Sequence, residues 1–190
     1  MFHRFFGSAP VPATAGPAAP VAPVTTSAGD TATVRRIVAK LEAMPPDQAR
    51  LIASAAYTLA RAANADLDIS DEETAAIERE LQANEALDEA TAVLVTEMAK
   101  LQAKTVGGTE DYVVTREFKA LSTVDQRLQV LRACFAIGAA NGTISAEETA
   151  VVNEIADELD IDDATLNAIR ADYHEQLSSV QEIRRVTRGA

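Results

Sequence analysis

The sequence predicts an all-α protein, a single bundle of about seven helices built from two halves that are related by an approximate twofold axis. Aromatic residues make up only 4% of the chain and there is no tryptophan, which favours helix over sheet. From Asp30 onward apolar residues recur at steps of three and four, the spacing that lines one face of a helix. Because 47% of the 190 residues are hydrophobic, the chain can build one core, and disorder throughout is excluded.

In the first half, the apolar periodicity predicts helices at about 31–43, 46–64, 71–83 and 86–104. Pro45 ends the first of them, and Pro46 can open the second because its missing N–H costs nothing in a first turn. The residues expected on the buried faces are Val34, Ile37, Val38, Leu41, Ile52, Ala55, Ala56, Leu59, Ala63, Ile77, Leu81, Leu94, Met98 and Leu101.

After a break at Gly107 and Gly108, the second half predicts a short helix near 111–120 and longer helices at about 123–140, 146–159 and 163–177. No segment has the pattern of a strand. Cys134 lies beside the apolar stripe of the first long helix, and we expect a small core residue there and no nucleophile. The residues expected to be buried are Val114, Phe118, Leu121, Val124, Leu128, Leu131, Phe135, Gly138, Val152, Ile155, Leu159, Leu166, Ile169, Tyr173 and Leu177.

The helical domain is expected to span residues 30–178. Residues 1–29 hold five of the seven prolines and are typical of an extended linker. Three of the five phenylalanines, Phe2, Phe5 and Phe6, precede that linker. Two interpretations stay open: a docking peptide for a partner groove or membrane surface, or a frayed start that packs on its own domain.

Charge is distributed unevenly along the chain. Residues 179–190 form a basic tail, with Arg184, Arg185 and Arg188 against Glu182, whereas the whole chain has a net charge of −12. A body that acidic repels phosphate backbones, so we expect no nucleic-acid binding. Cations or basic peptides are the ligands that its field would attract.

The sequence also bears on location. Pro10, Pro12 and Pro17 interrupt any secretory signal, and no stretch reaches the roughly 18 apolar residues of a membrane span. The single cysteine excludes an internal disulfide and a zinc site of clustered cysteines, and it fits a reducing compartment. We therefore expect a cytoplasmic protein with no direct membrane span.

A repeat supports the two-halves prediction. Residues 65–75, ADLDISDEETA, align without a gap to residues 140–150, ANGTISAEETA, with seven of eleven positions identical. Each copy contains a Ser-x-x-Glu capping box, Ser70 with Glu73 and Ser145 with Glu148, in which serine and glutamate satisfy each other's backbone N–H groups. The repeat predicts two similar helix pairs.

The first repeated loop adds carboxylates that the capping box does not explain. If the loop is extended, Leu67 and Ile69 face the core, and Asp66 and Asp68 face out together beside Glu73. Three carboxylates that lie close together repel each other unless a cation neutralises them, and oxygen ligands suit calcium or magnesium.

The loop is not an EF-hand, because Asp71 stands where that motif needs glycine and Ile77 where it needs glutamate. The second copy offers Asn141 and Glu148, with two hydroxyl groups and less charge, so it would bind a divalent ion more weakly unless the loops pool ligands. Solvated loop acids beside a capped helix are the alternative interpretation.

Two segments, AYTLARAANADLDISDEE and CFAIGAANGTISAEE, resemble the TerB-like family, a helical domain named after a tellurite-resistance protein. The resemblance extends over about residues 46–177. Leu67 replaces the glycine that the family pattern expects in the first copy, and Asn141 replaces the aspartate in the second. The acidic positions that the resemblance carries over as metal ligands are Asp66, Asp68, Glu73, Asn141 and Glu148.

The resemblance implies a helical bundle whose acidic face binds divalent cations, with a role in bacterial stress response to tellurite, beside protein partners that include an integral-membrane protein. We expect no enzyme, because the chain lacks Gly-rich phosphate loops, a Gly-x-Ser-x-Gly elbow and paired metal-binding histidines. Two functions remain in competition. One is a cation-responsive sensor or assembly domain, and the other is a metal-independent adaptor that uses its Phe-rich start, its acidic face or its arginine tail.

Overall fold

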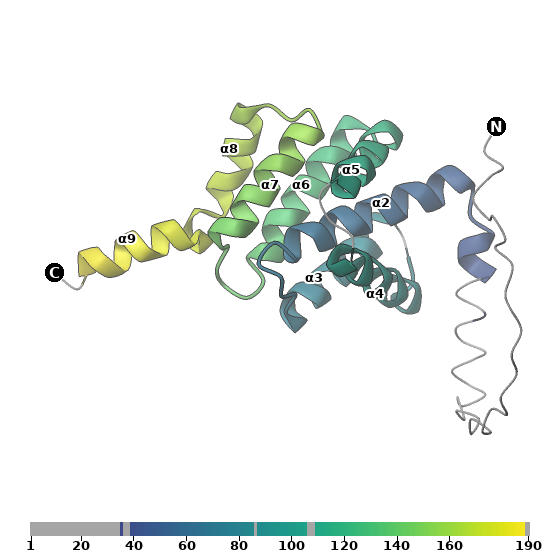
Figure 1. The fold of residues 1–190 in the computed structure, drawn as a ribbon, viewed down its shortest axis with the longest axis horizontal. Coiled ribbons are helices and arrows are strands. Elements are labelled where there is room, and N and C mark those ends of the chain that lie inside the picture. The colour runs from purple at the N-terminus through teal and green to yellow at the C-terminus, as the bar shows by residue number, and fades with distance from the viewer. Residues whose placement is uncertain (1–34, 36–38, 86, 106–108, 189–190) are drawn as a thin grey trace, which may run out of the picture.

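The computed structural model describes residues 35, 39–85, 87–105 and 109–188 (Figure 1). The expectations that lie outside these residues concern the linker 1–29 with Phe2, Phe5 and Phe6, the buried positions Val34, Ile37 and Val38, and the break at Gly107 and Gly108.

The described part of the chain is helical, and its one isolated bridge pairs Ile144 with Leu177 in place of any strand. The all-α prediction is therefore confirmed. The elements in chain order are α2 (Pro46–Ala63), α3 (Asp71–Glu85), α4 (Glu89–Thr105), α5 (Thr109–Leu121), α6 (Val124–Gly138), α7 (Ala146–Glu158), α8 (Asp163–Asp172), the 3₁₀ turn η1 (His174–Gln176) and α9 (Ser178–Arg188).

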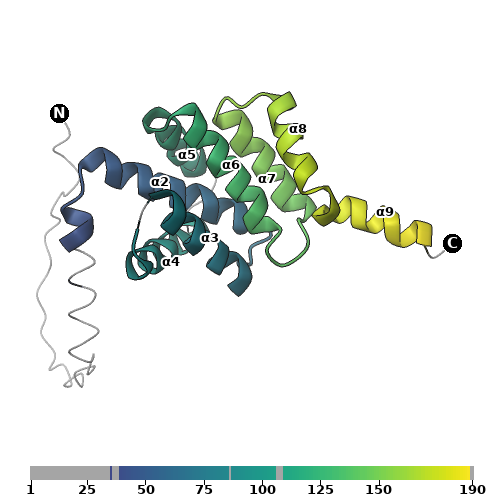
Figure 2. The ribbon, with the colours of Figure 1, turned by 180° about the vertical axis from the view of Figure 1, so that it is seen from behind.

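Helix α2 is the centre of the bundle and contacts α3, α4, α5, α6 and α7 (Figures 1 and 2). From Ile52 to Ala63 almost every residue is buried, and Ala56 and Ala60 are completely so. Small side chains let neighbouring helices approach α2 closely on all sides. The largest fully buried side chains around α2 include Phe118, Phe135, Ile77, Leu81 and Leu131, all of them predicted core residues.

Helix α4 presents a different face from the one we predicted. Met98 and Leu101, expected to be buried, are 56% and 62% exposed, whereas Val95 and Ala99 are buried. Because α2 is lined with alanines, the close contact favours the small side chains of α4 and turns the long ones outward. Val124 was also predicted to be buried, but it opens α6 and is 63% exposed.

The C-terminal part differs from the expected boundaries. Helix α8 ends at Asp172, η1 follows it, and the ring of Tyr173 stacks on that of Phe135 with 5.5 Å between centroids. Most of the basic tail predicted at 179–190 is helical, because Ser178–Arg188 form α9. Within the described ranges, none of the helices has the length and apolar character needed to cross a bilayer.

Candidate functional site at the paired interhelical loops

The two repeated loops have the same local structure. Asp66 accepts a hydrogen bond on Oδ1 from the backbone N–H of Asp68, and Asn141 accepts one from Thr143, both at 3.0 Å. The residue after Asp66, Leu67, has a φ of 71°, and the residue after Asn141 is a glycine with a φ of 95°. The repeat seen in the sequence is therefore a repeat of backbone conformation.

The left-handed residue corrects one prediction. We expected Leu67 to face the core in an extended loop, but its side chain is 83% exposed. A positive φ breaks the alternation of side chains that an extended segment would have, so Leu67 points to solvent. Ile69, two residues later, is buried as predicted.

Both capping boxes form as predicted. Ser70 donates its backbone N–H to Glu73 Oε2 at 2.7 Å, and Glu73 returns its N–H to Ser70 Oγ at 3.2 Å. In the second copy, Ser145 donates to Glu148 Oε2 at 2.7 Å, and Glu148 N donates to Ser145 Oγ at 3.0 Å. Each box fixes one carboxyl oxygen of its glutamate and orders the first turn of α3 or α7.

The two capping glutamates meet in the interior, where the halves of the bundle join. Glu73 and Glu148 are each only 3% exposed, and their carboxyl groups lie within hydrogen-bonding reach of each other. Burial raises the pKa of Glu148 from 4.5 to about 7; hydrogen bonds from Ser145 oppose the rise, and the neighbouring Glu73 adds to it.

The remaining oxygen of Glu148 needs a partner. Glu148 Oε1 is buried and receives no hydrogen bond. A Cβ placed on Gly138 would come within 3.1 Å of this oxygen, so glycine leaves the space that the carboxyl occupies. Two ionised carboxylates in such a place repel each other, and either a shared proton or a cation would remove the repulsion.

The structure divides the five predicted metal ligands into two sets. It brings Glu73 and Glu148 together, whereas Asp66, Asp68 and Asn141 are exposed on their loops. Throughout the described ranges, no three His, Cys, Asp or Glu side chains are grouped so that they could hold a metal ion. The buried pair fits a cation in charge and in its unpartnered oxygen, but the two loops as they stand do not pool the larger oxygen set that calcium usually takes.

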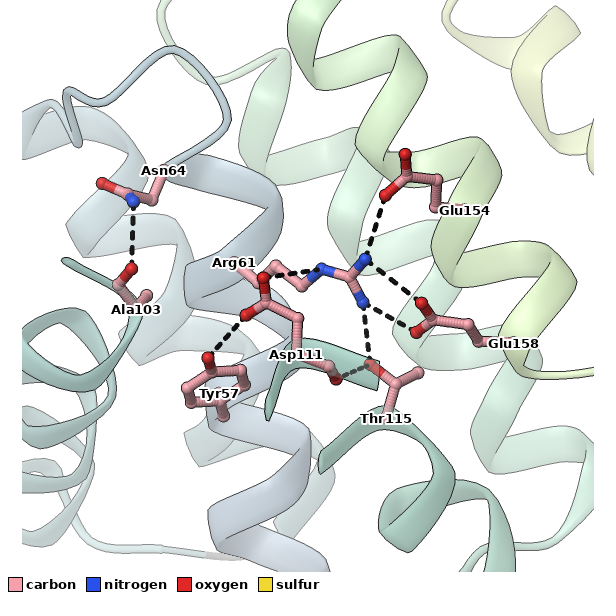
Figure 3. Close-up of polar contacts among 8 residues, drawn as sticks. All are labelled: Tyr57, Arg61, Asn64, Ala103, Asp111, Thr115, Glu154 and Glu158. Carbon is pink, nitrogen blue, oxygen red and sulfur yellow. Dashed lines mark hydrogen bonds and ion pairs between the residues drawn. The ribbon is translucent and has the colours of Figure 1, made fainter. Parts of the chain in front are cut away.

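A second polar cluster, which the sequence did not lead us to expect, is centred on Arg61 of α2 (Figure 3). Arg61 is 8% exposed and donates to Glu158 at 2.7 Å, to Glu154 at 3.1 Å and to Thr115 at 3.1 Å. Burial alone would lower the pKa of Arg61, but the hydrogen bond and charge of Glu158 outweigh burial and raise it. This cluster joins α2 to α5 and α7.

The hydroxyl of Tyr57 extends the Arg61 cluster by donating to Asp111 at 2.6 Å, and burial together with this bond raises the pKa of Tyr57. Beside the cluster lies an open cleft of about 350 Å³ lined in part by Arg61, Asn64 and Glu154. Asn64 donates to the carbonyl of Ala103 at 3.2 Å, while its own Oδ1 is buried without a partner. An arginine inside an alanine-rich apolar face was the one sequence signal for this cluster.

Comparisons with known proteins give one match. The model of the family described as tellurite resistance protein TerB matches residues 51–171, which is more than half of the chain. The match begins in α2, ends in α8 and contains both capping boxes and Arg61. No curated protein and no solved structure matches the chain.

Proposed function

Because the chain belongs to the TerB family, we propose that it is a non-catalytic stress-response domain of the tellurite-resistance type, which binds calcium or magnesium where its interhelical loops meet. In this proposal it acts as a sensor or assembly factor. Occupancy of the site changes the join between the two halves, and protein partners read that change.

The buried pair of Glu73 and Glu148 carries the proposal. Two carboxyls from separate halves, one with a buried oxygen that receives no hydrogen bond, make a place where a positive ion would be stabilised when both groups are ionised. Asp66 and Asp68 add exposed negative charge to the first loop, which attracts cations over roughly a Debye length of about 8 Å in physiological salt. Asn141 would supply an uncharged oxygen on the second loop.

The absence of catalysis is part of the proposal and is supported by the thiol. Cys134 is buried and unpaired, and burial raises its pKa to about 12, so it would not form a nucleophilic thiolate at neutral pH. A free thiol also fits the reducing cytoplasm that we propose as its location.

Thermal unfolding at pH 8, with EDTA, MgCl₂ or CaCl₂ added, tests cation binding. An ion that binds only the folded protein at a hundredfold excess over its Kd adds about 2.7 kcal/mol of stability, which is easily visible as a rise in Tm. We expect the rise in the original chain and its loss in Glu148→Gln. Glutamine can still form the capping box, so the variant removes the charge and keeps the cap.

Glu147→Gln is the matched control, because Glu147 is the exposed neighbour on the same first turn of α7 and has the same charge. It should keep the rise in Tm. Asp66→Asn and Asp68→Asn should reduce the rise without abolishing it, because they contribute attraction from the surface. Equal Tm values in all three buffers would exclude cation binding and leave the buried pair to a proton.

The second candidate function is a metal-independent adaptor. It is favoured by exposed apolar side chains such as Met98 on α4 and Ile183 on α9, which are 56% and 66% exposed. Its partners, an integral-membrane protein among them, would bind the Phe-rich start or the acidic face. Deletion of residues 2–6 should then abolish capture of a partner and leave Tm unchanged.

A further inference from the structure

Helix α9 leaves the bundle at the end opposite to the start of α2, as both views show (Figures 1 and 2). Its attachment is polar. Gln181 donates from Nε2 to the carbonyls of Gly142 at 3.0 Å and Glu175 at 3.1 Å, and Arg184 forms an ion pair with Glu175. The base of α9 is therefore held against the second interhelical loop and η1 by its hydrophilic side.

The apolar face of α9 is left without a partner among the described residues. At 100° per residue, Val180, Ile183 and Val186 share one side of the helix, and Gln181 and Arg184 share the opposite side. Ile183 is 66% exposed and Val186 is 65% exposed. An isolated helix of 11 residues is marginal in water, so a helix of this length needs packing on its apolar face.

The described residues also contain a groove of matching character. It lies between α2 and α4, has a volume of about 250 Å³ and is lined by apolar side chains that include Ile52, Ala53, Val95 and Met98. Exposed Met98 stands at this groove, and the pocket is open to solvent. An amphipathic helix placed in an apolar groove is a common mode of protein recognition.

Charge and position identify the occupant. The groove is built from the first part of α2, far from α9 in both views, so α9 cannot reach the groove of its own chain (Figures 1 and 2). Pairing of α9 with another α9 would bring Arg184, Arg185 and Arg188 against their own copies. An anionic membrane would meet the net charge of −12 of the whole chain.

The groove of a second copy avoids each of these penalties. Exposed Asp47, in the first turn of α2, and exposed Glu97, next to Met98 on α4, place negative charge beside the groove and complement the arginines of α9. We propose that α9 of one copy docks through Val180, Ile183 and Val186 in the α2–α4 groove of a second copy.

This contact joins two different surfaces, so it is head-to-tail. Repetition of a head-to-tail contact gives a chain of copies, or a ring if the rotation closes. Few apolar side chains enter the groove, so we expect a dissociation constant on the order of micromolar and association that depends on concentration. The proposal is independent of cation binding.

Sedimentation velocity of the full chain between about 1 and 200 µM tests the proposal with two variants. Ile183→Ser removes the centre of the docking face, and Ala53→Arg places a bulky positive charge in the groove at an exposed position of α2. We expect the original chain to associate and each variant alone to remain monomeric. A mixture of the two should form a 1:1 dimer and nothing larger, because one copy keeps the groove and the other keeps α9.

Val113→Ser is the control, since Val113 is 58% exposed on α5 and lies away from both surfaces; it should associate like the original chain. Unchanged circular dichroism and Tm in each variant establish that the fold is intact. A monomeric original chain at the highest concentration would overturn the proposal. So would dimers of Ala53→Arg, which would mean that α9 pairs with itself, or binding to phosphatidylserine vesicles that only Ile183→Ser loses.

Discussion

Glu73 and Glu148, which stand at equivalent positions of the two repeated segments, bring their carboxyl groups within hydrogen-bonding reach inside the bundle. Each glutamate closes the capping box of its own helix through Oε2. The repeat thus produces a pair of acids where the halves join, and the protonation of this pair is coupled to folding.

The stability of the fold is expected to fall as pH rises from about 5 to 8. The pKa of Glu148 is 4.5 in its ordinary state and about 7 in the folded chain, so between these values the folded state binds more protons than the unfolded state. The stabilisation is complete below the lower pKa and is lost as pH passes the higher one. Urea unfolding in this range should show a loss on the order of 2 kcal/mol.

The same titration in Glu148→Gln should be nearly flat between pH 5 and 8, because glutamine carries no charge. Glu147→Gln removes an exposed carboxylate and should keep the slope of the original chain. Identical slopes in the original chain and Glu148→Gln would show that this pair does not control the dependence.

Gly138→Ala is expected to destabilise the protein at pH 8, although alanine normally stabilises a helix by about 1 kcal/mol relative to glycine. The added Cβ would lie 3.1 Å from Glu148 Oε1, and the capping box limits how far that carboxyl can move. We expect a loss of about 1 kcal/mol by urea unfolding. A gain of stability would mean that the carboxyl moves aside freely.

Leu67→Gly is expected to stabilise the protein by about 0.5 kcal/mol, because glycine adopts the left-handed conformation without the cost that a leucine bears. The reverse change in the second copy, Gly142→Leu, should cost about 1 to 2 kcal/mol. Nothing lies within 4 Å of a Cβ at Gly142, so that cost would come from the backbone and not from a clash. Changes of the same sign in the two loops would contradict the equivalence of their conformations.

The sequence predicted the helices and both capping boxes because these depend on local spacing. It could not predict that Glu73 and Glu148 meet, since a capping box fixes one oxygen and says nothing about how two halves approach. The expected cluster with Asp66 failed to form for a local reason, which is the positive φ of Leu67. The exposed face of α4 around Met98 followed from the close approach to α2, a tertiary effect that periodicity does not contain.

Arg61→Met is expected to be the most damaging of these substitutions. Arg61 is the buried cation that faces Glu158 and Asp111, whose side chains are only 14% and 20% exposed. Removing it leaves those partly buried carboxylates facing one another without compensation, and breaking a buried ion pair in this way costs about 3 to 5 kcal/mol.

Arg50→Met is the control for that change, because Arg50 lies on the same helix, is 55% exposed and pairs with Asp47 and Glu117 at the surface. Exposed pairs contribute at most about 1 kcal/mol, so its midpoint in urea should hardly move. If Arg61→Met and Arg50→Met lowered the free energy of unfolding equally, the Arg61 cluster would not be holding α2, α5 and α7 together. A large loss confined to Arg61→Met would instead place the electrostatic centre of the bundle at α2, beside the open cleft that Arg61 lines.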